Sequence, residues 1–289
     1  MPAPDGIKKR SNVRAKENTN TLGKLLSASI ALFAASTVLS GVAYAGTVAP
    51  GGSAVVGAGD PAETWNVQND ATLDVMAGGK VNETTVFGTL NMNGATASPS
   101  GAPSGYVVTV FGGNANITGS SLSGQGGLGI SGFIDTVGSA VVTNSDIQGV
   151  SQAVLVQHGS TLNMTGGTVK GGTHRFELIN GADVIIDGTT ITSGGVGIFA
   201  YAGSSAGAVG SNVELRNGSI TSVGHGVNLR DGSRAVISGS KIETTGANAR
   251  GVFANGIGTH AEITDTDIIT RSNTAPGIEL AAGASANAT

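Results

Sequence analysis

The sequence contains no cysteine and has few aromatic or charged residues. Of its 289 residues, 4% are aromatic and 12% are charged, although 39% are hydrophobic. Without cysteine, disulfides cannot stiffen the fold, and so few aromatic side chains cannot fill an ordinary globular core. The chain is also too apolar to be disordered. Its stability must therefore have another source, and a long ladder of backbone hydrogen bonds along a solenoid would provide it.

Residues 1–45 differ in composition from the rest and are typical of a signal peptide. A basic stretch precedes an apolar run that ends at Val42. The pattern Ala43-x-Ala45 matches what signal peptidase reads, which predicts cleavage before Gly46. The alternative is a membrane anchor, because about 18 apolar residues can just span a bilayer. No stop-transfer charges follow the run, so we expect export.

Basic residues are scarce after the predicted signal peptide. Six of the 15 basic residues and two of the 19 acidic residues lie in it, so residues 46–289 carry nine basic and 17 acidic side chains. Nucleic acids and anionic lipids both require basic patches on the proteins that bind them. The charge balance therefore disfavours nucleic acid as a partner.

Two sequence marks recur with a period of 22 residues. One is a Gly followed by a small residue, and the other is an Ile or Val in a short strand with polar flanks. The distance from strand mark to Gly is 12 residues in the first four units, and the distance to the next strand mark is usually 10. Insertions of seven, four and three residues interrupt the period. The glycines are Gly159, Gly181, Gly203, Gly232, Gly258 and Gly283, and the strand marks are Ile147, Val169, Ile191, Ile220, Ile242 and Ile268.

Each unit contains three short segments in which apolar and polar residues alternate, which predicts three strands per unit. Such strands leave no room for a helix of ordinary length. They are stable only if successive coils stack at about 4.8 Å, so that equivalent strands form parallel sheets. Corners rich in Gly and Asn would supply the left-handed conformations that tight turns need. The sequence therefore predicts an all-β fold, a right-handed parallel β-helix.

Weaker copies of the unit extend the pattern toward the N-terminus. Thr89–Gly94 resembles Thr161–Gly166, and we expect the first coils near Trp65. A run rich in Pro, Ser and Gly at residues 97–104 is typical of a loop. Leucine-rich repeats would need a Leu/Asn consensus that is missing, and a membrane barrel would need strands of about 9–11 residues. The expected parts are a signal peptide (1–45), an irregular N-terminal segment (46–105) and regular repeats (106–289).

The repeat style resembles that of a known family. Units such as Val213–Ser222 and Gly226–Ser233, the absence of cysteine and the Ala-x-Ala leader are similar to the passenger region of pertactin-like autotransporters. The resemblance covers about residues 106–289 and includes no catalytic motif. It implies an exported adhesin or virulence factor of Gram-negative bacteria, secreted or held at the cell surface, with a host receptor, a cell-surface receptor or matrix as partner.

Members of that family also carry a C-terminal translocator barrel, which is missing here. The sequence stops at Thr289 in mid-repeat, so we expect it to be the N-terminal part of a longer protein. Contact with the outer membrane would then require the missing barrel. If the product is truncated, the resemblance implies a periplasmic location and allows a nonfunctional gene product.

No catalytic, metal-binding or cofactor-binding constellation stands out. A nucleophilic serine motif with His and Asp partners is absent, and Gly124–Gly129 matches G-x-G-x-x-G without a helix to follow. We therefore predict a non-enzymatic protein without cofactor. We assign the four histidines to solvated turns between coils: His158, His174, His225 and His260.

The enzymatic alternative is a β-helix polysaccharide lyase or hydrolase, which requires clustered carboxylates. Asp265 and Asp267 would lie on one side of a strand, and Asp146 and Asp187 take similar positions in their units. The pattern therefore allows a carboxylate row. The simpler interpretation is a set of solvated charges that protect strand edges from aggregation.

One outward column of side chains is the candidate contact face. Leu155, Phe199 and Phe253 place apolar residues on alternate coils, with Tyr201 beside them. Such an exposed apolar strip is typical of a surface that binds a partner. The alternative is that the insertion at residues 201–211 covers the strip, or that the inward and outward positions are exchanged there. The full column is Leu155, Glu177, Phe199, Asn228, Phe253 and Glu279.

Overall fold

The structure, a computed structural model, describes residues 46–100, 105–132 and 136–289. In these residues it has 28 β-strands and no helix, so it holds no helix able to cross a membrane. The predicted cleavage residues Ala43 and Ala45 lie outside the described residues, whereas Gly46 opens the first strand.

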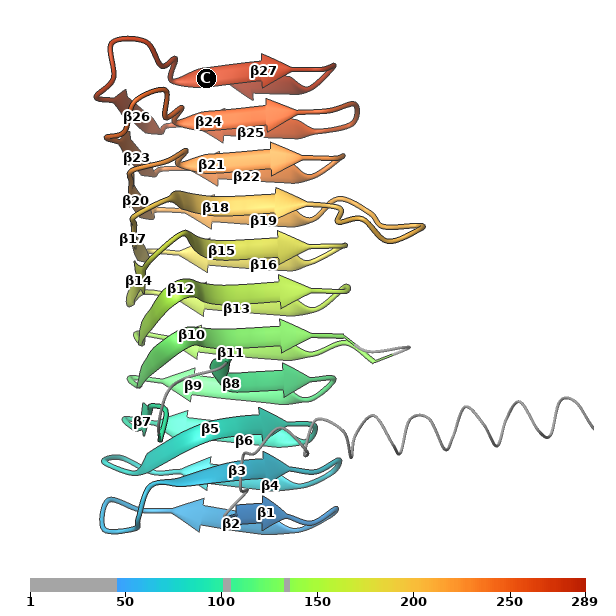
Figure 1. Ribbon diagram of the computed structural model, residues 1–289, viewed down its shortest axis with the longest axis vertical. Helices are drawn as coiled ribbons and strands as arrows, with labels where there is room; N and C mark the ends of the chain where they lie inside the picture. The colour runs from blue at the N-terminus through green and yellow to red at the C-terminus, as the bar shows by residue number, and fades with distance from the viewer. Residues whose placement is uncertain (1–45, 101–104, 133–135) are drawn as a thin grey trace, which may run out of the picture. The chain divides into compact units, whose positions relative to one another are not determined.

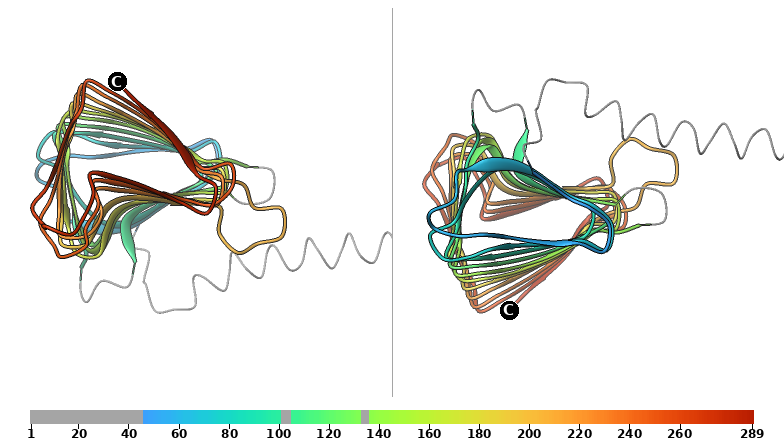
Figure 2. Two further views of the ribbon diagram at one scale, coloured as in Figure 1. Left: turned by 90° about the horizontal axis from the view of Figure 1, so that it is seen from above. Right: turned by 90° about the horizontal axis from the view of Figure 1, so that it is seen from below.

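Eleven coils stack into a parallel β-solenoid, which confirms the predicted fold class (Figure 1). Figure 2 looks along the stack and shows a three-sided outline in the C-terminal coils. Each side is a ladder of parallel strands; ladders 1 and 2 take one strand from each coil, and ladder 3 begins at β5. In a regular coil such as β13-β14-β15, the chain passes through ladder 2, ladder 3 and ladder 1 in that order.

The strands of the three ladders have the following bounds. Ladder 1 contains β1 (Gly46–Val48), β3 (Glu63–Val67), β5 (Lys80–Val86), β8 (Tyr106–Phe111), β10 (Ser121–Ser131), β12 (Asp146–Gln157), β15 (His174–Ile179), β18 (Val196–Tyr201), β21 (Val227–Arg230), β24 (Val252–Asn255) and β27 (Ile278–Ala281). Ladder 2 contains β2 (Ser53–Val56), β4 (Thr72–Val75), β6 (Thr89–Asn93), β9 (Asn114–Thr118), β11 (Ser139–Thr143), β13 (Thr161–Thr165), β16 (Asp183–Asp187), β19 (Asn212–Arg216), β22 (Arg234–Ser238), β25 (His260–Thr264) and β28 (Ser285–Ala288). Ladder 3 contains the first parts of β5, β10 and β12, with β7 (Thr96–Ala97), β14 (Thr168–Gly171), β17 (Thr190–Ser193), β20 (Ser219–Ser222), β23 (Lys241–Thr244) and β26 (Asp267–Thr270).

The 22-residue period and the three insertions have the predicted places. Strand β16 starts 22 residues after β13, and β22 starts 22 residues after β19. The seven-residue insertion forms the loop between β18 and β19, which projects from the stack in Figure 1. The insertion of four residues lies mostly between β23 and β24, and the insertion of three lies between β26 and β27.

The core is a narrow column of stacked aliphatic side chains. In ladder 2, Met164, Ile186, Leu215 and Ile237 lie one above another in register, and all four are buried. Burying a side chain of this size contributes about 1.5–3 kcal/mol. Many equal layers therefore replace the aromatic core that the composition excludes.

The recurring Gly marks are explained by the turn from ladder 1 to ladder 2. At Asn180-Gly181 the φ angles are +53° and +77°, and at Asp231-Gly232 they are +53° and +79°. Two successive left-handed residues reverse the chain tightly, and the second position carries Gly because Gly adopts this conformation without steric cost. The small residue that follows, such as Ala182 or Ser233, is fully buried and directly precedes the strand of ladder 2.

The first coil begins earlier than the sequence predicts. Strand β1 pairs with β3, and Val48 and Val56 are already buried. The Trp65 ring lies against Gly46, where an added Cβ would stand 2.5 Å from a ring carbon. The prediction of a start near Trp65 is wrong because these first strands are too short to show alternation.

Candidate binding face

The outward column predicted from the repeat exists as a continuous register in ladder 1. Leu155 pairs with Glu177, Glu177 with Phe199, and Phe199 with Asn228. The register continues through Phe253 and Glu279. Phe199 and Phe253 are partly exposed, whereas Glu177 and Asn228 are 7% and 4% exposed.

Phe199 is the centre of the first of two aromatic clusters. Its ring stacks on Tyr201 at a centroid distance of 4.6 Å and lies 5.3 Å from the ring of His174 on the preceding coil. The guanidinium of Arg230 lies 5.4 Å from the Phe199 centroid, within range of a cation–π interaction. We call Phe199, Tyr201, His174 and Arg230 the Phe199 cluster.

Phe253 repeats this arrangement two coils further along the solenoid. The His225 ring lies 5.3 Å from Phe253 at an interplanar angle of 37°, the same values as for His174 and Phe199. The Arg250 guanidinium lies 5.2 Å from the Phe253 centroid. Two bonds of 2.7 and 3.1 Å also join Arg250 to the Glu279 carboxylate. We call Phe253, His225, Arg250 and Glu279 the Phe253 cluster.

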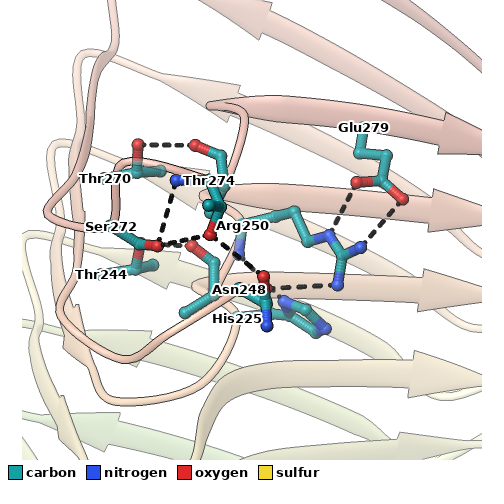
Figure 3. A network of polar contacts seen from close by, with 10 residues as sticks. His225, Thr244, Asn248, Arg250, Thr270, Ser272, Thr274 and Glu279 are labelled. Carbon is teal, nitrogen blue, oxygen red and sulfur yellow. Dashed lines mark hydrogen bonds and ion pairs between the residues drawn. The ribbon is translucent and has the colours of Figure 1, made fainter.

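The corner loops next to the Phe253 cluster hold Arg250 in place (Figure 3). Arg250 donates to the Asn248 carbonyl, and the Asn248 amide oxygen accepts from the Thr274 hydroxyl on the next coil. Thr244 and Thr270, which are paired in ladder 3, each donate to a carbonyl five residues later. The two insertions therefore stack on each other and fix the guanidinium from one side.

Two tyrosines fix polar groups on the same face. The Tyr201 hydroxyl donates to Glu177 at 2.8 Å, and the Tyr106 hydroxyl donates to Gln152 at 2.6 Å. Burial and the neighbouring Glu177 carboxylate raise the pKa of Tyr201 to about 12, and the same causes raise the pKa of Tyr106 further. Both phenols therefore remain hydrogen-bond donors at physiological pH.

The insertion between β18 and β19 is tied to a neighbouring turn. Gly181 donates its N–H to the Val209 carbonyl, and the Val209 N–H donates to the Asn180 side chain. Phe199 keeps partial exposure beside this loop. Of the segment 201–211, Tyr201 stacks on Phe199, whereas Val209 is held at the turn after β15.

The structure does not form the carboxylate row that the sequence allowed. Asp146 begins β12 in ladder 3, whereas Asp187 ends β16 in ladder 2. Asp265 has a φ of +46° in the turn before β26, while Asp267 is its first residue. In the described part of the chain, no group of three or more His, Asp and Glu side chains could hold a metal ion.

Sequence reasoning placed His174 and His225 in solvated turns, but both belong to the aromatic clusters. Where ladder 1 begins, two consecutive residues are buried in most coils, for example Arg175 and Phe176. This breaks the alternation of inward and outward residues, so a residue three positions before the outward column, such as His174 before Glu177, faces outward instead of inward. The signal available in the sequence was the identical spacing of His174 to Glu177 and of His225 to Asn228 in the aligned units.

The His225 ring predicts a pH dependence of stability. Burial, followed by Arg250 and Arg230, lowers the pKa of His225, although Glu279 acts in the opposite direction. The ring Nδ1 accepts the Arg250 backbone N–H at 3.1 Å, a bond that a protonated ring cannot accept. A depressed pKa means that the unfolded chain binds the proton more readily, so stability decreases as the pH falls below about 6.5.

We therefore expect the midpoint of thermal unfolding to decrease from pH 7 to pH 5 with a contribution from His225. The variant His225→Gln should lose that contribution, and its midpoint should depend less on pH over this range. His260→Gln is the matched control, since within the described residues the His260 ring bonds only to the exposed Ser285 hydroxyl. Equal pH profiles for wild type and His225→Gln would contradict the assignment.

Comparisons with known proteins show likeness in fold alone. No protein-family model and no curated protein sequence matches the chain, so they add nothing to the pertactin-like resemblance. One similar structure is the crystal structure of PfbA, a surface adhesin of Streptococcus pneumoniae. Its sequence is 8% identical, the TM-score is 0.41, and the match covers 83% of this chain and 82% of that one. The A-module of the Azotobacter vinelandii mannuronan C-5 epimerase AlgE6 is 9% identical with a TM-score of 0.30, covering 86% and 91%. The chain is a parallel β-solenoid, and its similar structures include both an adhesin and an epimerase.

Proposed function

We propose that the protein is an exported, non-enzymatic binding scaffold, the passenger of an autotransporter, which holds a cell-surface receptor or matrix component on the outward face of ladder 1. The signal-peptide pattern and the pertactin-like repeat style support export and surface display. The solenoid supports the binding role, because a rigid stack presents side chains at fixed positions without an ordering cost on binding.

The observation that carries this proposal is the pair of aromatic clusters on one face. Phe199 and Phe253 keep exposed surface while Arg230 and Arg250 lie against their rings. Aromatic and arginine side chains dominate the binding energy of interfaces. Here they are held by the ladder and by hydrogen bonds, so the face is organised before any partner arrives.

The acidic groups of this face favour binding over acid–base catalysis. Glu177 accepts the Tyr201 hydroxyl, and Glu279 forms a two-bond ion pair with Arg250. A general acid or base must be free to exchange a proton with the substrate. Both carboxylates instead act as fixed acceptors, Glu177 for Tyr201 and Glu279 for Arg250.

The test is a binding assay with the purified protein on mammalian cell monolayers and on immobilised extracellular matrix. The double variant Phe199→Ser/Phe253→Ser should bind at least about tenfold more weakly, because loss of one aromatic anchor costs about 2 kcal/mol or more. Val236→Ser is the matched control, since Val236 faces outward on ladder 2 and is 41% exposed. Equal binding by the double variant and the wild type would refute the proposed face.

A further inference from the structure

We infer that the ligand of this face is a neutral, linear glycan that lies along the solenoid axis and contacts both aromatic clusters. This inference rests on the proposed function, because it names the chemical class of partner for the same face. It follows from the chemistry of each cluster, from the charge balance of the face and from the repeat of the clusters along the axis.

Each cluster combines a partly exposed ring with polar groups in fixed positions. A sugar ring has an apolar C–H face and a rim of hydroxyl groups, so it suits an aromatic face bordered by hydrogen-bonding groups. Beside Phe199 these groups are the exposed Arg230 guanidinium and the Tyr201 hydroxyl, which the buried Glu177 carboxylate holds in place. Beside Phe253 they are Arg250 and the Glu279 carboxylate. Carboxylates accept from hydroxyls and guanidiniums donate to them.

The charge balance of the face favours a neutral ligand. The Arg250 charge is compensated by Glu279 at 2.7 Å. The Phe199 cluster contains one cation, Arg230, which lies over the Phe199 ring, and the Glu177 carboxylate is paired with Phe199 from the preceding coil. Residues 46–289 also carry more acidic than basic side chains. A sulfated or carboxylated polymer would be repelled by the carboxylates of the face, and the face has no excess of positive charge to attract it. A neutral glycan meets no such cost.

The repeat of the clusters favours a polymer over a single compact ligand. Phe199 and Phe253 belong to the same register column, with Asn228 between them. Parallel strands lie about 4.7–4.9 Å apart, so the two rings are separated along the axis by about twice that distance. The His–Phe distance of 5.3 Å and the angle of 37° are the same in both clusters. A polymer of repeating units can make the same contact at both rings. Once the first ring is bound, the second contact forms within the same complex, which raises the overall affinity.

The experiment is calorimetric titration of the full chain with cello-oligosaccharides and chito-oligosaccharides of one to six sugar units. We expect weak binding of the shortest members and a gain of at least tenfold in affinity once the chain reaches both rings. Phe253→Ser and Phe199→Ser should each remove this gain, while Val236→Ser should keep it. Melting curves of each variant show that the fold is retained.

Three outcomes would overturn the inference. They are the absence of binding by every neutral oligosaccharide, affinity that is independent of Phe199 and Phe253, and binding of heparin fragments in place of neutral chains. Periodate treatment of the cell monolayers separates this inference from the proposed function. If treated cells are still bound through Phe199 and Phe253, the partner is a protein and only the glycan inference fails. If untreated cells are not bound through these rings, both fail.

Discussion

Replacing Arg175 by methionine should lower the free energy of unfolding by about 3 kcal/mol, although methionine fills a similar volume. The Arg175 side chain is fully buried where ladder 3 turns into ladder 1. Its guanidinium donates to the carbonyls of Thr192 and Gly172. A buried carbonyl left without a donor costs about 1–3 kcal/mol, and methionine donates nothing.

Other coils show why the guanidinium is needed at this level. At the end of the equivalent ladder-3 strands, Ser193 donates its hydroxyl to the Val196 carbonyl and Thr244 donates to the Ala249 carbonyl. The residue paired with Ser193 one coil earlier is Gly171, which has no side chain. Arg175 therefore supplies to this corner the donors that a serine or threonine supplies elsewhere. Burial lowers the pKa of Arg175 to about 10, so it remains charged at neutral pH.

Urea unfolding monitored by circular dichroism measures the effect, and hydrogen exchange locates it. Because the stability of a solenoid is nearly a sum over neighbouring coils, exchange should increase most in β14, β15 and β17. Arg234→Met is the matched control, since Arg234 is an exposed residue at the start of β22, and its loss should change stability by no more than about 0.5 kcal/mol. Wild-type stability in Arg175→Met would show that the carbonyls do not depend on the guanidinium.

Arg175 also marks the limit of what the repeat could predict. The period of 22 fixes which strands stack, and therefore which residues share a column, because equivalent residues of successive coils must pair. Phe199 and Phe253 could be placed on one face for this reason. The period says nothing about the corners, where alternation fails and an arginine turns inward while a histidine turns outward.

The candidate site was accordingly predicted only in its central column. Phe199, Phe253 and Tyr201 follow from alternation within strands of ladder 1. Arg230 and Arg250 do not, because the Arg230 guanidinium reaches Phe199 from the next coil and the Arg250 guanidinium reaches Phe253 from the corner before β24, and side-chain reach is not encoded in a period. The role of Asn248 in fixing Arg250 depends on contact between two insertions, which no repeat describes.

Replacing Gly171 by alanine should be at least as disruptive as the loss of Arg175, with a cost of more than about 3 kcal/mol. A Cβ at Gly171 would lie 1.5 Å from the Gly149 carbonyl oxygen of the preceding coil, and its φ of +145° is a conformation that other residues rarely adopt. The obstacle is backbone, which belongs to a hydrogen-bonded ladder, so it cannot move aside without separating two coils. The same Cβ would also stand 3.0 Å from an Arg175 nitrogen.

A second glycine separates the effect of crowding from that of backbone conformation. Gly188 has a φ of +64°, but the nearest atom to its added Cβ lies at 4.0 Å. The next coil has Asn217 in the equivalent corner, with a φ of +50°. Gly188→Asn should therefore be nearly neutral, and Gly188→Ala should cost about 1–2 kcal/mol from conformation alone. Denaturant unfolding of the three variants tests this order. If Gly171→Ala were no worse than Gly188→Ala, close approach of the coils would not be what keeps Gly171 a glycine.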